Sequence, residues 1–196
     1  MIISRAAFIP RPITQECETL VQIADAFSGI ARDSEKGAPG EIPHLAQTLS
    51  SLGDAVCSGE WSFREEWILV SREILRAGRC LGRAAGDIET WGAPPPSRAL
   101  GLEGRLREIV LELMEAAGAM GSAPAQKRLV ALKSKTAGFQ AAYRRARAAL
   151  LEADSTPGAM KALETCRILS DAADALASAG ETMSWIAAQS GGCHGH

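Results

Sequence analysis

A seven-residue repeat of apolar side chains between Ser62 and Trp91 constrains the fold of this chain more than any other feature. One row of the repeat is Trp67, Ile74, Leu81 and Ile88, and the row three residues further on is Val70, Ala77, Ala84 and Trp91. Seven residues make about two helical turns, so both rows lie along one side of a helix. The stretch therefore predicts a long helix that packs against other long helices.

Local signals mark the two ends of this helix. Ser62-Phe63-Arg64-Glu65 fits the S/T-x-x-E capping box, in which the Ser62 hydroxyl accepts from the Glu65 amide. Gly92 followed by three prolines, at positions 94–96, supplies the stop, because proline cannot donate a backbone hydrogen bond. The same signals and the 3.6-residue spacing of apolar residues predict five further helices, from Thr14 to about Glu35, from Pro43 to about Gly59, from about Ser97 to Met120, from Pro124 to about Glu152, and from Pro157, capped by Thr156, to about Ser190.

Composition supports an all-α fold without a sheet. Hydrophobic residues make up 46% of the chain but aromatic residues only 5%, and the β-branched and aromatic residues typical of strands are scarce. We expect one domain over residues 1–196, built of two three-helix units, about 13–91 and 97–191, with residues 192–196 as a flexible tail. The net charge of −2 favours neither nucleic acid nor an anionic membrane.

The expected compartment is the cytoplasm. Five cysteines are scattered along the chain without a C-x-x-C pair, which indicates a reducing environment. The stretch from Met1 to Pro12 is interrupted by charges and prolines and is predicted to be neither a signal peptide nor an anchor. No apolar run reaches the ~20 residues that a membrane span needs.

Three stretches in order carry a resemblance to a known family. Leu49–Asp54 is similar to an acidic L-E-x-E-x-D motif, Ser62–Glu66 to P-F-D-R-E-D, and Leu169–Asp174 to L-E-E-x-x-D. Together they resemble the PhoU-like family of phosphate-transport regulators, in the branch that accompanies Pit-type phosphate transporters, over roughly residues 13–191. The resemblance implies a PhoU-like bundle of about six long antiparallel helices. It also implies a non-enzymatic accessory role in inorganic phosphate transport, through a Pit-type transporter or a signalling partner, with peripheral membrane association through the transporter.

The family holds metal ions between paired acidic motifs, which implies a set of candidate ligands here. They are Asp54, Asp171, Asp174 and Glu181. The chain departs from the motifs at other places: Ser50 and Leu52 replace acids, as do Lys133 and Lys135 in the second copy. Converging carboxylates are what Mg²⁺ or Ca²⁺ needs, so we expect no cofactor and regard a metal cluster as doubtful.

The acidic stripe of Asp171, Asp174 and Glu181 has three interpretations. It is a solvated helix face, or it meets Lys133, Lys135 or Arg76 where a metal sits in the family, or it retains a metal ion. Separately, Cys193-His194-Gly195-His196 contains ligand types for Zn²⁺, Ni²⁺ or Cu²⁺ on a terminal tail.

The helix predicted from Pro124 is strongly basic. Its candidate interaction residues are Lys133, Lys135, Arg144, Arg145 and Arg147. They either neutralise acids on the preceding helix or form a docking face for an acidic partner or for the membrane surface beside a transporter. Nucleic acid is not expected, because no stacking aromatics are interleaved.

The function classes that stay open are therefore few. The chain has no glycine-rich phosphate loop, metalloprotease motif or nucleophile elbow, so an enzyme is not expected. Besides the transport regulator, the alternatives are a self-associating scaffold or adaptor unrelated to phosphate and a metal-binding bundle. Gly78, Gly82 and Gly86 form a ridge without side chains, which we expect to pack closely against another helix of the bundle, with the last helix as the candidate neighbour, and otherwise to form a homodimer contact.

Overall fold

The computed structural model describes residues 9–32, 40–91, 100–152 and 156–191. It contains six long helices, and no described residue belongs to a strand. The helices are α1 (Arg11–Arg32), α2 (Glu41–Ser58), α3 (Arg64–Trp91), α4 (Leu100–Ala119), α5 (Pro124–Leu151) and α6 (Pro157–Gly191). The predicted all-α bundle of six helices is confirmed.

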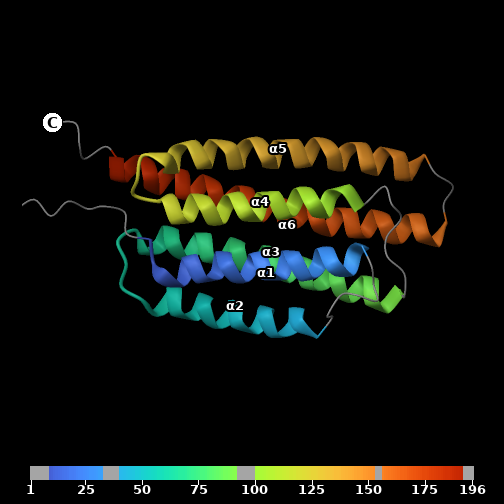
Figure 1. Ribbon diagram of the computed structural model, residues 1–196, viewed down its shortest axis with the longest axis horizontal. Helices are drawn as coiled ribbons and strands as arrows, with labels where there is room; N and C mark the ends of the chain where they lie inside the picture. Colours follow the sequence, from blue (N-terminus) through green and yellow to red (C-terminus); the bar gives the residue numbers. More distant parts are fainter. Residues whose placement is uncertain (1–8, 33–39, 92–99, 153–155, 192–196) are drawn as a thin grey trace, which may run out of the picture.

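The helices lie side by side along the long axis of the molecule (Figure 1). Helices α1, α3, α4 and α6 form the centre, in which α1 packs on α3 and α4 while α6 packs on α3 and α4. Among the six described helices, α2 contacts only α1 and α3, and α5 contacts only α4 and α6. The first three helices thus contact one another, the last three do likewise, and each group has one outer helix.

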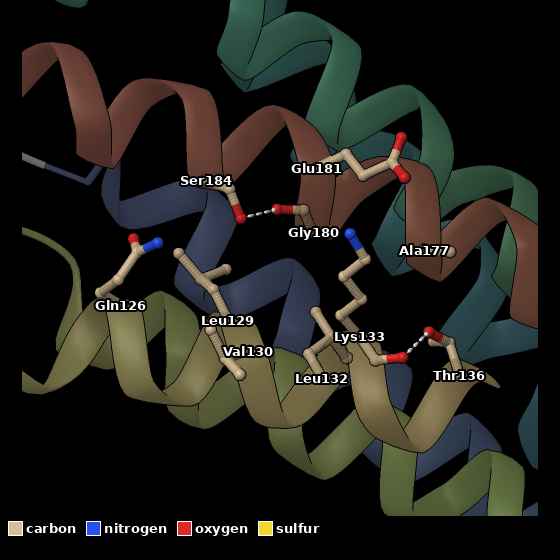
Figure 2. Close-up of a pocket in the computed structure, with 10 residues that line it drawn as sticks. All are labelled: Gln126, Leu129, Val130, Leu132, Lys133, Thr136, Ala177, Gly180, Glu181 and Ser184. Atoms are coloured by element: carbon tan, nitrogen blue, oxygen red, sulfur yellow. Dashed lines mark hydrogen bonds between the residues drawn. The ribbon is translucent and has the colours of Figure 1, made fainter. Parts of the chain in front are cut away.

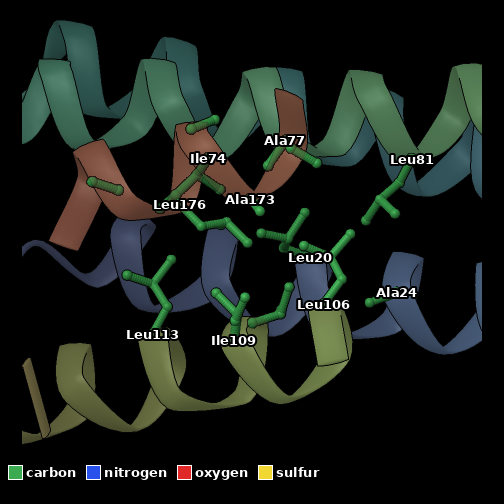
Figure 3. Packing of buried hydrophobic residues seen from close by; sticks show 14 of the residues in the cluster. Leu20, Ala24, Ile74, Ala77, Leu81, Leu106, Ile109, Leu113, Ala173 and Leu176 are labelled. Atoms are coloured by element: carbon green, nitrogen blue, oxygen red, sulfur yellow. The ribbon is translucent and has the colours of Figure 1, made fainter. Parts of the chain in front are cut away.

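The core contains the apolar rows that the repeat in α3 predicts, except Trp91 at the end of the helix, which is only half-buried. Trp67, Ile74 and Ile88 are fully buried and Leu81 is 1% exposed. Figure 3 shows Ile74 and Leu81 facing leucines and isoleucines from α1, α4 and α6. Full burial of each such side chain stabilises the fold by about 1.5–3 kcal/mol. The predicted one-sided burial of this helix is therefore confirmed.

Two predicted helix starts are wrong in the same way. Helix α1 begins at Arg11 rather than at Thr14, and the Pro10 carbonyl accepts from the Ile13 amide at 2.9 Å. Helix α2 begins at Glu41, two residues before Pro43. The amides of a helix's first turn have no partner within the helix, so a proline is accepted there, and its position does not fix the first residue.

The predicted capping box at Ser62 is also wrong. Phe63 has a φ of 57°, which is left-handed, so the helix starts only at Arg64. The Phe63 carbonyl then accepts from the Trp67 amide at 3.0 Å. The Phe63 ring lies edge-on to Trp185 of α6, with the ring centroids 6.1 Å apart. At α6 the predicted cap is confirmed: the Thr156 hydroxyl oxygen accepts from the Ala159 amide at 3.2 Å.

The glycine ridge of α3 faces α2, not α6 as expected. A Cβ on Gly78 would lie 2.6 Å from Leu49 Cδ2 of α2, so this glycine permits a close approach of the two helices. A Cβ on Gly82 would meet only Ile42, at 3.7 Å, and one on Gly86 would meet nothing within 4 Å. The predicted close packing within the bundle is confirmed at Gly78, but the suggested neighbour is wrong, because α2 and not the last helix covers this side of α3.

Within the described residues, no helix is long and apolar enough to cross a membrane. The predicted tail, residues 192–196, and most of the residues between the predicted helices at about 36–42, 92–97 and 154–157 lie outside the described residues.

Candidate functional site

The structure does not bring the four candidate metal ligands together. Asp54 is exposed on α2, a helix that does not contact α6. On α6, Asp171 accepts a hydrogen bond from Arg167 at 2.9 Å, and Asp174 accepts one from Gln140 Nε2 of α5 at 2.7 Å. Glu181 is exposed. In the described part of the chain, no three His, Cys, Asp or Glu side chains are grouped to hold a metal ion. The tail from Cys193 lies outside the described residues, and the expected absence of a metal cluster stays a prediction to be tested.

Two cations expected near the acidic stripe have other partners. Arg76 pairs with Glu73 on its own helix at 3.4 Å. Lys135 Nζ lies 2.6 Å from Glu112 Oε2 of α4. Neither replaces a metal at the α6 acids.

Glu112 is the centre of an ion-pair network between α4 and α5. Its side chain is 4% exposed, and Arg128 approaches it at 3.3 Å besides Lys135 at 2.6 Å. Arg128 also pairs with Glu115 at 2.5 Å. Burial opposes ionisation of Glu112, but the hydrogen bonds and charges of Lys135 and Arg128 outweigh it and hold its pKa below the ordinary value. The predicted neutralisation between these helices is confirmed for Arg128 and Lys135, so Lys135 belongs to the helix contact.

The other basic residues of α5 point to solvent. They are Lys127, Lys133, Arg144, Arg145 and Arg147, all exposed, and together they are named the basic face. None of them makes an ion pair with another described residue. Helix α5 itself contains no aspartate or glutamate over its 28 residues. The basic face is therefore a concentration of positive charge that no described residue compensates by an ion pair.

Small side chains run between these charges along the outer side of α5. This small-residue seam consists of Ser134, Ala137, Ala141 and Ala148, whose spacings of three, four and seven residues keep them on one stripe. Val130 and Leu151 lie towards the two ends of the stripe and are 61% and 62% exposed. The outer side of α5 thus carries an apolar stripe with positive charges on both flanks.

A pocket of about 440 Å³ lies between α5 and α6 beside this stripe (Figure 2). Its lining consists of Gln126, Leu129, Val130, Leu132, Lys133, Thr136, Ala177, Gly180, Glu181 and Ser184. The hydroxyls of Thr136 and Ser184 donate to carbonyls of their own helices, at 2.9 Å each. Lys133 and Glu181 therefore supply the charged groups of the pocket, from opposite walls, and no ion pair joins them.

A buried carboxylic acid lies where α1, α2 and α3 meet. Glu16 is 0% exposed, and its Oε1 accepts from the Ser71 hydroxyl at 2.6 Å. Its Oε2 has no hydrogen-bond partner in the described structure. Burial raises the pKa of Glu16 to about 7, against the opposing effect of the Ser71 hydrogen bond. Gly53 of α2 lies against this pair, and a Cβ there would clash with Leu75, whose Cδ1 would be only 2.7 Å away.

Sequence reasoning missed Glu16, although a signal was present. The residue lies three after Ile13 and four before Leu20, both of which are fully buried. An acid at that spacing is on the apolar side of the helix.

Two of the described cysteines, Cys17 and Cys166, are buried thiols. Cys17 is fully buried, and burial raises the pKa of its thiol. Burial also raises the pKa of Cys166, to about 11. A thiol rather than a thiolate is present at neutral pH in both cases, and the thiol is the unreactive form.

Comparisons with known proteins identify the fold. No family model matches the sequence, and no curated protein matches it significantly. Among solved structures, the bundle is similar to the crystal structure of a protein from Shewanella oneidensis MR-1 that is provisionally named a PhoU-like phosphate regulatory protein. The TM-score is 0.70 at 12% sequence identity, over 91% of this chain and 98% of that one. The chain therefore has a PhoU-like all-α fold, and the predicted resemblance is confirmed at the level of the fold.

Proposed function

We propose that this chain is a non-enzymatic regulator of inorganic phosphate transport that acts in the cytoplasm by binding a Pit-type transporter or a signalling partner. The observation that carries the proposal is the match of nearly the entire bundle to a protein named for phosphate regulation. Because a shared fold does not by itself define a function, the proposal also needs a surface able to bind a partner.

The basic face supplies such a surface. Its five charges lie on an outer helix that contacts only α4 and α6, so they are accessible to another molecule. Complementary charge accelerates association and selects among partners. An acidic segment of a transporter or signalling protein fits this surface.

The test is phosphate uptake in cells that carry the gene, a deletion, or variants. We expect deletion to change the initial rate of radiolabelled phosphate uptake and the tagged protein to co-purify with a Pit-type transporter of the same cells. Reversal of Arg144 and Arg147 to glutamate is expected to reproduce the deletion. The matched control reverses Arg72 and Arg79, which are exposed on α3 of the other three-helix unit.

Uptake that is unchanged by deletion, at both limiting and abundant phosphate, would refute the proposal. Stable self-association of the purified protein without a transporter in the complex would favour the scaffold alternative.

A further inference from the structure

We infer that the outer side of α5 binds an acidic, amphipathic helix of a partner protein, about 20 residues long. The inference deepens the proposed function and rests on it only for the identity of the partner's pathway. Three features of α5 and α6 support it: the basic face, the small-residue seam between its charges, and the adjoining pocket.

The charges define the partner's sign and shape. Successive residues of a helix differ by about 100° in direction, so Lys133, Arg144 and Arg147 lie on the α6 flank of the seam, and Lys127 and Arg145 lie on the other flank. A partner that satisfies both flanks carries carboxylates on both sides of a central stripe. An amphipathic helix with acids bordering a narrow apolar stripe has this arrangement.

The seam distinguishes a protein helix from a membrane surface. Helices that bind the bilayer interface insert large side chains such as Trp, Phe and Leu. The seam instead presents Ala and Ser, which insert little apolar area but allow the backbone of a second helix to approach closely. Gly138 beside the seam adds to this room, since a Cβ there would meet no atom within 4 Å.

The pocket provides an anchor for the partner. At about 440 Å³ it is near the lower end of the ~300–1,000 Å³ of pockets that enclose small ligands, and it admits a large side chain from the bound helix. Leu129 and Val130 give it an apolar wall next to the seam. Buried apolar anchors contribute most of the affinity in many interfaces. Lys133 and Glu181 at the pocket have opposite charges, so they favour one orientation of the helix.

The length of the stripe sets the length of the partner. Val130 and Leu151 are 21 residues apart, which at ~1.5 Å per residue is about 30 Å. A helix of about 20 residues covers this distance. A second copy of the chain fits poorly, because two α5 helices would bring ten unpaired positive charges together.

The experiment uses the full chain and a fluorescein-labelled probe peptide of 21 residues, designed as a helix with a Leu/Ala stripe flanked by glutamates. A peptide of the same composition in scrambled order is the control. Fluorescence anisotropy at low and moderate salt measures binding. We expect the ordered peptide to bind at least tenfold more tightly than the scrambled one, with an affinity that falls as salt increases.

Two variants test the surface. Ala137→Trp fills the seam, and we expect at least a tenfold loss of affinity for the ordered peptide. Ala55→Trp, at an exposed position of α2, is the matched control and should bind like the parent. Thermal melts followed by circular dichroism verify that both variants fold, and reversal of Arg144 and Arg147 to glutamate provides a second, charge-based test.

Other outcomes would overturn the inference. Equal binding of ordered and scrambled peptides, or an Ala137→Trp variant that binds as well as the parent, would show that the seam is not a docking site. Binding to vesicles of anionic phospholipid, unaffected by Ala137→Trp, together with no peptide binding, would assign the face to a membrane. A dimer in light scattering that is lost in Ala137→Trp, again without peptide binding, would assign it to a second copy. Peptide binding without any phosphate phenotype would refute the proposed function and leave the docking site standing.

Discussion

The buried acid Glu16 makes a strong prediction about the pH dependence of stability. In the Glu16→Gln variant the side-chain oxygen that accepts from Ser71 is kept, and the size is nearly unchanged, but the group no longer ionises. Because the folded protein holds the pKa of Glu16 at about 7 instead of 4.5, the folded state binds more protons than the unfolded state between these values. Stability therefore falls as the pH rises through this range and levels off above pH 7.

The magnitude follows from the pKa difference. One pKa unit corresponds to about 1.4 kcal/mol, so ionisation of Glu16 costs the folded state about 3 kcal/mol once it is complete. From pH 5 to pH 8 the parent should lose about 2.5 kcal/mol from this group. For a domain of this size that is a fall of roughly 5–10 °C in the melting temperature.

The assay is urea unfolding of the parent and of Glu16→Gln at a series of pH values from 5 to 8. We expect the free energy of unfolding of the variant to show little of this fall. At pH 8 the variant should be more stable than the parent by about 1–2 kcal/mol, which is the ionisation cost of about 3 kcal/mol less about 1–2 kcal/mol for the unpaired amide. Glu18→Gln, on the exposed side of α1, is the control and should keep the parent's slope. A Glu16→Gln variant with the full pH slope of the parent would refute the argument that burial of this carboxyl dominates.

Three further predictions concern the packing, the ion pairs and the metal content. Gly78→Leu should cost about 1–3 kcal/mol in denaturant unfolding, because α2 packs on this glycine, whereas Gly86→Leu, which faces open space, should cost nothing measurable. Lys135→Met removes the nearest partner of Glu112, so it should lower the free energy of unfolding by about 1–3 kcal/mol at neutral pH. The difference from the parent should shrink as the pH falls below 4.5, because Glu112 then becomes protonated. The control Lys133→Met should change the free energy of unfolding by no more than about 0.5 kcal/mol. Protein that lacks residues 193–196 and is purified without chelator should contain no stoichiometric iron, zinc, manganese or nickel by elemental analysis, and a tightly held metal would contradict this.

The sequence predicts the helices well because each has a periodic apolar side. It does so less well at the ends, where one tertiary contact decides the conformation. Phe63 is an example. The sequence contains a capping box here, but Phe63 adopts a positive φ, and its ring packs on Trp185, more than a hundred residues away in the sequence. Such a contact cannot be read from a local motif.

The candidate site likewise has features that the sequence predicts and features that only the packed structure decides. The positive charge of α5 is evident in the sequence, and so is its lack of acids. Which lysine is neutralised depends on rotation: Lys135 turns toward Glu112, whereas Lys133, two residues earlier, lines the pocket beside α6. Two residues on a helix differ by about 200° in direction, so the allocation of each charge requires the packed structure. The departures of this chain from the family's acidic motifs, by contrast, can be identified from the sequence alone.

The two outer helices differ in a way that locates the docking surface. Both α2 and α5 contact only two other helices, so each has a side turned to solvent. Helix α2 has 18 residues, carries few charged residues and is held close to α3 through Gly78. Helix α5 has 28 residues, and at ~1.5 Å per residue it extends about 15 Å further. Its five exposed cations make no ion pair with another described residue, and the repulsion between like charges costs stability. An acidic partner removes that cost on binding, which makes α5, and not α2, the side of the bundle at which a partner is expected.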